Sequence, residues 1–187
     1  MNVKDLALVA LIAALYATLV FVFSIISSGP IQLRVADCLI PLASLLGLPA
    51  VAGVTLGALV ANTYNFLSPI DVVFGALANL IAAYVIFRMR RMLFLACVIG
   101  SCVIGIIVGG YLWFFIETID ILSQTLPFWL ASIIRITFSS ILAIAVLGYW
   151  LVKALQASGF DKLLESKGIQ VKDDDSDSDS STYEKHT

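Results

Sequence analysis

The chain has 187 residues, of which 60% are hydrophobic and 13% are charged, and its mean hydropathy is +1.01. Soluble domains are about half apolar and about one quarter charged, so this composition excludes a water-soluble globule. The formal net charge of -2 arises in residues 173–187, which hold six of the thirteen acids. The rest of the chain is therefore slightly basic.

The first predicted element is a membrane-spanning helix over residues 6–26. A span needs about 20 apolar residues because the hydrocarbon core is about 30 Å thick and a helix rises about 1.5 Å per residue. This run is too long for the apolar part of a signal peptide, and no small-residue cleavage site follows it. We therefore expect a retained first helix, followed by a polar loop over residues 27–35.

The next apolar region, residues 36–64, is too long for one span and too short for two full ones. A Leu-Gly-Leu-Pro sequence at 46–49 divides it. As a helix, the part before the division would cross only one third to one half of the membrane. It therefore predicts a short or tilted helix beside the ordered loop. Pro69 then occupies a position typical of a helix N-terminus, and a helix over residues 70–87 ends at a basic cluster, Arg88-Met89-Arg90-Arg91.

Residues 92–115 predict a fifth helix and residues 128–152 a sixth, with a polar hinge over 117–127 between them. Lysine and arginine are retained on the cytoplasmic side, and placing both termini there satisfies this rule for nine of eleven positive residues. The prediction is an all-α membrane protein of the cell membrane: a six-transmembrane-helix bundle with an ordered outer loop after helix one. Residues 1–155 form its substrate-binding domain, and residues 156–187 form a cytoplasmic, largely disordered acidic tail.

Charged side chains inside a bilayer cost about 3 kcal/mol or more at its centre, so each needs a reason. In this topology six lie on the outer side: Arg34, Asp37, Asp71, Glu117, Asp120 and Arg135. Two alternatives are open: they converge on one outward-facing pocket, or they form interfacial ion pairs such as Arg34 with Asp37. We interpret Asp37 and Arg135 as functional, and Glu117 and Asp120 as members of ion pairs.

Amide side chains add hydrogen-bonding groups to the same region. An amide facing lipid would leave its donors unpaired, so Asn62 and Asn79 must face protein, water or ligand. Interhelical hydrogen bonds and ligand contacts are both open for them, whereas Gln32 in the outer loop is a ligand candidate. Aromatic residues at the helix ends, Tyr111 among them, are interpreted as interfacial belt residues. The predicted substrate-binding residues are Gln32, Arg34, Asp37, Asn62, Asp71, Asn79 and Arg135.

The first helix carries two overlapping pairs of alanines at a spacing of four, Ala10 with Ala14 and Ala13 with Ala17. Such pairs allow another helix to approach closely. The approaching helix belongs either to a partner subunit, which makes these four residues candidates for partner docking, or to the same chain.

Motifs of enzymes and nucleotide binders are absent from the sequence. No phosphate-binding loop, metalloprotease histidine pair, serine elbow or pair of catalytic carboxylates occurs, and the acidic tail has Ser178 where a calcium loop needs glycine. We therefore expect no enzyme, no cofactor, no metal site and no nucleic-acid partner. Transport driven by ATP would need the ATPase of another subunit.

Three blocks carry a resemblance to a known family: SGPIQLRVAD at 28–37, LGALVAN at 56–62 and IDVVFGALA at 70–78. In this order and spacing they resemble the QueT family of queuosine-precursor transporters, over roughly residues 6–152. These are substrate-binding S components of energy-coupling-factor transporters. The resemblance implies a six-helix bundle whose extracellular pocket is closed by the loop after helix one. It also implies that the alanine-rich first helix docks on a transmembrane coupling subunit, and that ATPase subunits complete the importer.

The resemblance further implies a 7-deazaguanine-type base as the substrate. Asp37, where the family usually has Glu, would bind the donor edge of the base, and Arg34 or Gln32 would meet its carbonyl, much as bidentate pairs read guanine. The acid that the family often carries near Ser139 is absent here. A positively charged aminomethyl substituent would favour an acid-lined mouth. Two other hypotheses are a self-sufficient proton-coupled carrier, although no inverted repeat is evident, and a non-transporting membrane scaffold.

Overall fold

The computed structural model describes residues 2–23, 34–64, 68–115 and 126–159, and every regular element in these ranges is a helix. By length and composition, four of its helices can cross a membrane: Val3–Val22, Pro69–Arg88, Arg90–Leu112 and Phe128–Ala157. Two shorter apolar helices, Val35–Leu46 and Leu48–Tyr64, lie between the first and second of these. The all-α prediction is confirmed for the described residues, while the count of six spans stays a prediction.

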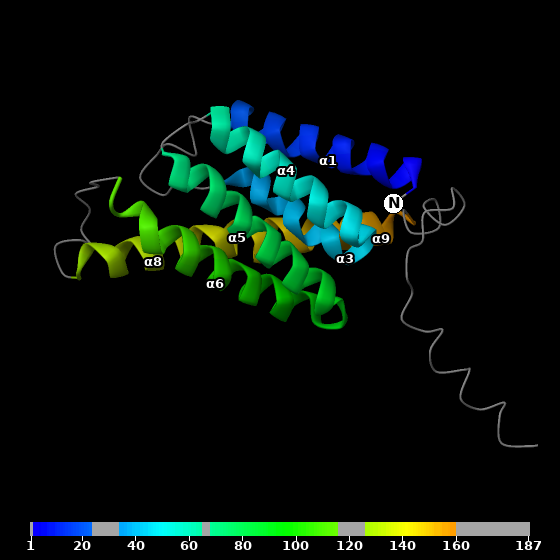
Figure 1. The fold of residues 1–187 in the computed structure, drawn as a ribbon. Coiled ribbons are helices and arrows are strands. Elements are labelled where there is room, and N and C mark those ends of the chain that lie inside the picture. The colour runs from blue at the N-terminus through cyan, green and yellow to red at the C-terminus, as the bar shows by residue number, and fades with distance from the viewer. Residues whose placement is uncertain (1, 24–33, 65–67, 116–125, 160–187) are drawn as a thin grey trace, which may run out of the picture.

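Helix α1 (Val3–Val22) and helix α4 (Leu48–Tyr64) pack side by side along their lengths (Figure 1). Two glycines of α4 permit this contact. A Cβ on Gly53 would lie 2.8 Å from the Ile12 Cβ, and one on Gly57 would lie 2.7 Å from the Tyr16 Cβ. Small residues at a spacing of four let two backbones approach closely in a membrane. The contact is therefore made by glycines of α4 against the Ile12 and Tyr16 side of α1.

The divided apolar region folds as two short helices and one long one. A 3₁₀ helix, η1 (Val35–Leu42), runs into one turn of α-helix, α3 (Ala43–Leu46), and Gly47 then breaks the chain with φ +67° before α4 begins. Only glycine adopts this left-handed conformation without strain. The predicted break at 46–49 and the short helix before it are both confirmed.

Helix α5 (Pro69–Arg88) begins at the predicted proline, and the Ser68 hydroxyl caps it by accepting from the Asp71 N–H at 3.1 Å. A short 3₁₀ turn, η2 (Arg90–Met92), leads into α6 (Leu93–Leu112). Helix α6 packs against the last span through two more glycines, because a Cβ on Gly109 would lie 2.6 Å from the Ile133 Cα and one on Gly105 would collide with Thr137.

The last span combines α8 (Phe128–Ser140), a π-helical segment η3 (Ile141–Gly148) and α9 (Tyr149–Ala157). A π segment leaves carbonyls without their usual i+4 partners. The Ser101 hydroxyl of α6 lies 3.1 Å from the Ser140 carbonyl at its start and shares its proton with the Cys97 carbonyl at 2.8 Å. At its end Gly148 admits η1, since a Cβ there would lie 2.7 Å from the Pro41 Cγ.

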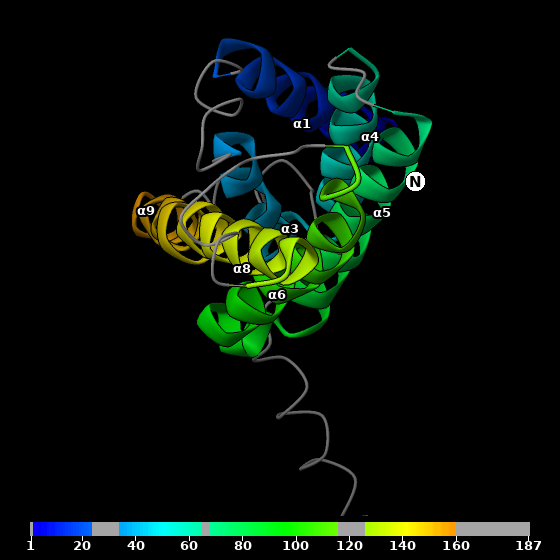
Figure 2. The ribbon, with the colours of Figure 1, turned by 90° about the vertical axis from the view of Figure 1, so that its left-hand side faces the viewer.

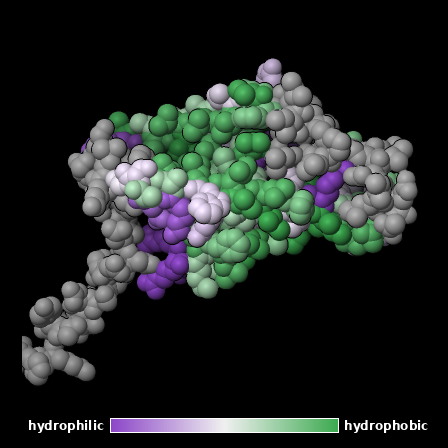
Figure 3. All heavy atoms as spheres, turned by 180° about the vertical axis from the view of Figure 1, so that it is seen from behind, coloured by the Kyte–Doolittle hydropathy of each residue, from purple (hydrophilic) through white to green (hydrophobic). Residues whose placement is uncertain are grey.

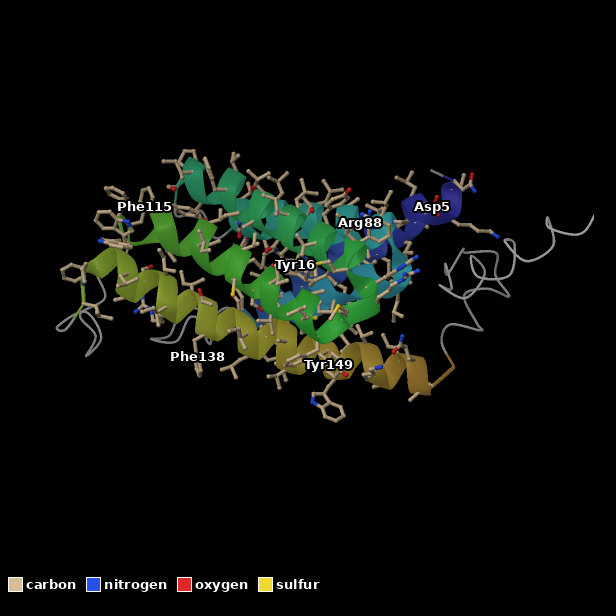
Figure 4. All side chains as sticks on the ribbon, turned by 90° about the horizontal axis from the view of Figure 1, so that it is seen from below. Asp5, Tyr16, Arg88, Phe115, Phe138 and Tyr149 are labelled. Carbon is tan, nitrogen blue, oxygen red and sulfur yellow. The ribbon has the colours of Figure 1, made fainter. Side chains whose placement is uncertain are left out.

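The helices form one elongated bundle with two distinct ends (Figures 1 and 2). We call one the Arg88 end: the start of α1, the α5–α6 connection and the end of α9 lie there, and Figure 4 places Asp5 and Arg88 together at it. We call the opposite one the Arg34 end, where α1, α4 and α6 finish and α5 and α8 begin. Figure 3 shows a largely hydrophobic face between the two ends.

Candidate substrate-binding site

Asp37 on η1 is 2% exposed and lies within the apolar bundle. The Tyr16 hydroxyl of α1 donates to its Oδ1 at 2.5 Å, and the Asn79 amide of α5 donates to the Tyr16 oxygen at 2.7 Å. Tyr16 itself is fully buried, about midway along the bundle in Figure 4. These three side chains therefore form a closed group that ties α1, η1 and α5 together.

A second group lies nearer the Arg34 end. The Arg34 guanidinium donates to the Asn62 Oδ1 of α4, and the Asn62 amide donates to the Asp71 backbone carbonyl at 3.2 Å. The Tyr111 hydroxyl of α6 donates to the Asp71 Oδ1 at 2.8 Å. Asn62 is 2% exposed and Asp71 is 9% exposed. This group therefore joins α4, α5 and α6 to the residue that precedes η1.

Arg34 links the two groups, because its side chain donates to Asn62 and its backbone carbonyl accepts from the Asp37 N–H at 3.0 Å. Asp71 and Asn79 are eight residues apart on α5, which corresponds to about 12 Å along the helix axis. The polar groups thus run from the Arg34 end to the middle of the bundle. We refer to Tyr16, Arg34, Asp37, Asn62, Asp71, Asn79 and Tyr111 as the polar network.

Gly75, one turn after Asp71, leaves room for the network. A Cβ at this position would lie 2.4 Å from the Asn62 Nδ2 and 3.6 Å from the Tyr111 hydroxyl oxygen. The Asn62 amide therefore occupies the space that any larger residue at 75 would fill. This is a physical reason for the Asp-x-x-x-Gly spacing at 71–75.

Five of the seven predicted binding residues, Arg34, Asp37, Asn62, Asp71 and Asn79, thus lie together in the network. Arg135 lies on α8 and is partly buried. Gln32, Glu117 and Asp120 lie outside the described residues.

The buried positions of three polar residues were not predicted from the sequence. Tyr16 sits in an otherwise apolar first helix, and a tyrosine far from either end of a span is the signal that would have identified it. Tyr111 was expected in the interfacial belt, but its hydroxyl bonds to the buried Asp71. Ser132 of α8 is 5% exposed, and its hydroxyl has no hydrogen-bond partner in the described part of the chain. Since its neighbour Ile133 lies against Gly109, Ser132 has a depth similar to that of Tyr111.

The four alanines of the predicted docking pattern lie on two faces of α1. Ala17 is buried, and Ala13 contacts α4, because its Cα would lie 3.1 Å from a Cβ on Gly57. Ala10 and Ala14 are exposed. Of the two pairs, Ala10 with Ala14 is therefore the one open to a partner helix.

A bundle of apolar helices with a buried, charged hydrogen-bonding network is the architecture of a membrane protein that handles a polar solute, because such groups are costly in lipid. The family model that matches this chain is described as QueT transporter and covers residues 6–157. The chain therefore belongs to the QueT transporter family. It is a multi-pass membrane protein of a transporter family and not an enzyme, as the sequence predicted. No curated protein and no solved structure matches it.

Proposed function

We propose that this chain is the substrate-binding subunit of an energy-coupling-factor importer, and that it captures a 7-deazaguanine-type queuosine precursor from outside the cell. Family membership supports the transport of a small molecule. The sequence contains no nucleotide-binding loop, so energy from ATP would come from partner ATPases through a transmembrane coupling subunit.

The polar network is the single observation that carries this proposal. It places two carboxylates, one guanidinium and two amides inside an apolar bundle, where each costs free energy unless it is paired. A purely structural bundle needs no such groups. Flat bases present donor and acceptor edges that carboxylates, guanidinium groups and amides bind in pairs, so the network has the chemistry that a deazaguanine requires.

The orientation of the chain in the membrane follows from where its lysines and arginines lie. Lys4, Arg88, Arg90, Arg91 and Lys153 belong to elements that begin or end at the Arg88 end. Cytoplasmic flanks retain such residues, so we place the Arg88 end in the cytoplasm and the Arg34 end outside. The polar network then lies in the outer half of the membrane, where a substrate arriving from outside reaches it first.

Within this site Asp37 binds the donor edge of the base, and Arg34 meets the carbonyl edge with Asn62 beside it. Asn79 and Tyr16 hold the Asp37 carboxylate in place. Tyr111 holds that of Asp71.

Helix α1 is the proposed docking element for the coupling subunit. Ala10 and Ala14 lie on its exposed face, where small side chains let a partner helix approach closely. Ala13 contacts α4 instead, and Ala17 is buried within the bundle. Docking therefore uses one alanine pair and the fold of the bundle uses the other.

Purification from producing cells followed by mass spectrometry of the bound small molecule tests the proposal. We expect a 7-deazaguanine base in the purified protein, with coupling and ATPase subunits recovered under mild detergent extraction. A different class of metabolite would contradict the substrate. Recovery of the base without partners, together with uptake into vesicles driven by a proton gradient, would indicate a self-sufficient carrier.

A further inference from the structure

Ser132 carries a buried hydroxyl that does not bond to its own helix. Three hydroxyls in the other helices, those of Thr55, Thr63 and Ser101, each donate to the carbonyl four residues earlier at 2.7–2.8 Å. The Ser132 hydroxyl has no hydrogen-bond partner in the described part of the chain, although the residue is as buried as the core around it. A buried hydroxyl without a partner is costly, because it loses its bonds to water and gains none. Its partner is therefore a group outside the described residues.

The Ser132 side of α8 faces protein and not lipid. Ile136, one turn later, is buried on the same side, and this stripe continues through buried residues of η3 to Gly148, which contacts η1. Ile133 is turned about 100° around the helix from Ser132 and contacts α6 instead. Ser132 thus lies on the side of the last span that faces η1, and Arg34 is the residue from which η1 begins.

Ser132 also lies at the level of the polar network. The contact of Ile133 with Gly109 fixes this turn of α8 against the last turns of α6. Tyr111 is two residues, or about 3 Å, further along α6, and its hydroxyl bonds to Asp71. The network reaches this level from α4, α5, α6 and the start of η1, and Ser132 reaches it from α8.

We propose that Ser132 is a further substrate-binding residue, whose hydroxyl bonds to a polar edge of the base that the polar network binds. This inference rests on the proposed function and adds one residue to its site. The base supplies the hydrogen-bond partner that the described residues do not. A ring nitrogen, an amino group or a carbonyl oxygen would suit this position, because a serine hydroxyl both donates and accepts. Binding then joins the last span to the helices that carry the network.

Calorimetry with 7-cyano-7-deazaguanine and thermal unfolding in the absence of the base, both on the purified full chain, test this role. Ser132→Ala should weaken binding about three- to tenfold, as expected for the loss of one neutral hydrogen bond. Its melting temperature without the base should equal or exceed that of the wild type, because the substitution removes a buried polar group and no bond within the described chain. Weaker binding without lower stability distinguishes a ligand contact from a structural one.

Ser101→Ala is the matched control, since Ser101 is fully buried and its hydroxyl lies within hydrogen-bonding distance of the Cys97 and Ser140 carbonyls. It should lower the melting temperature by about 2–4 °C and change affinity by less than about twofold. Binding by Ser132→Ala within about twofold of the wild type, or a melting temperature lowered as in Ser101→Ala, would overturn the role of Ser132 and leave the proposed function intact. Absence of binding by the wild type would instead contradict the proposed function, and this inference with it.

Discussion

The hydroxyl of Tyr16 has one proton and donates it to Asp37, while its oxygen accepts from Asn79. The direction of this chain is fixed, because an amide N–H can only donate and the hydroxyl must then donate onward. Asp37 is therefore an acceptor whose orientation is determined by a residue of α1. A tyrosine at this position is more than a packing residue, since its polar atom connects three helices at the middle of the bundle.

Tyr16→Phe should therefore lower both stability and ligand affinity. Phenylalanine preserves the ring but removes the hydroxyl to which the buried Asp37 and Asn79 both bond, which costs about 1–3 kcal/mol. Thermal unfolding in detergent and a ligand titration measure the two effects.

Tyr84→Phe is the matched control, because Tyr84 is 52% exposed on the outer surface of α5. Removing this exposed hydroxyl should change the free energy of unfolding by less than about 0.5 kcal/mol. Equal melting temperatures for Tyr16→Phe and the wild type would show that the buried hydrogen bonds contribute nothing.

Individual polar residues were predictable where a charged or amide side chain interrupts an apolar run, as Asp37, Asn62 and Asn79 do. Their partners were not. Arg34 bonds to Asn62 from 28 positions away, and Tyr16 and Asn79 are separated by 63 positions. A single sequence holds no record of such pairs, and tyrosine near a span is ordinarily an interfacial residue.

At the scale of elements, helix boundaries followed from proline, glycine and the basic cluster, whereas helix contacts did not. The break at Gly47 and the start of α5 at Pro69 were predicted, because both residues act through local backbone geometry. The pairing of α1 with α4 depends on Gly53 and Gly57, whose role in helix packing was not predicted from the sequence. The alanine pairs of α1 had two equally open interpretations; Ala13 contacts α4 within the chain, whereas docking through Ala10 and Ala14 stays a prediction.

Ala14→Leu should weaken assembly with the coupling subunit and leave ligand affinity and thermal stability unchanged. Ala14 is on the exposed face of α1, where a larger side chain keeps a partner helix at a distance without disturbing the bundle. Co-purification of the partner and ligand binding are measured on the same preparation.

Gly57→Val provides the contrast, since even its Cβ would lie 2.7 Å from the Tyr16 Cβ and 2.8 Å from the Ala13 carbonyl oxygen. It should lower thermal stability and ligand affinity together, because α1 and Tyr16 must move. Loss of ligand binding in Ala14→Leu as well would mean that the exposed face of α1 is part of the fold and not a docking surface.

At the scale of the molecule, the chain is an apolar bundle with a basic Arg88 end and a polar network toward the Arg34 end. Composition alone predicted the membrane location, because an excess of apolar residues this large has no soluble alternative. The acidic tail contributed nothing to that prediction and lies outside the described residues. Its sequence is rich in aspartate and serine and has almost no apolar side chains to bury.

Deletion of residues 173–187 should therefore leave ligand affinity within about twofold and the melting temperature within about 2 °C of the full chain, since the removed segment has little apolar surface to bury. Calorimetry and thermal unfolding of the truncated and full chains make the comparison. A melting temperature lower by several degrees would show that the tail packs on the bundle.

The central claim is that the polar network captures a 7-deazaguanine base through Asp37, and calorimetric titration of wild type, Asp37→Asn and Asp37→Glu tests it most directly. Asparagine keeps the size of Asp37 but removes its charge, so the donor edge of the base loses a charge-assisted hydrogen bond. We predict a loss of about 1.5–3 kcal/mol, or about ten- to a hundredfold in affinity, with Asp37→Glu much closer to the wild type. Binding by Asp37→Asn within about twofold of the wild type would contradict the account.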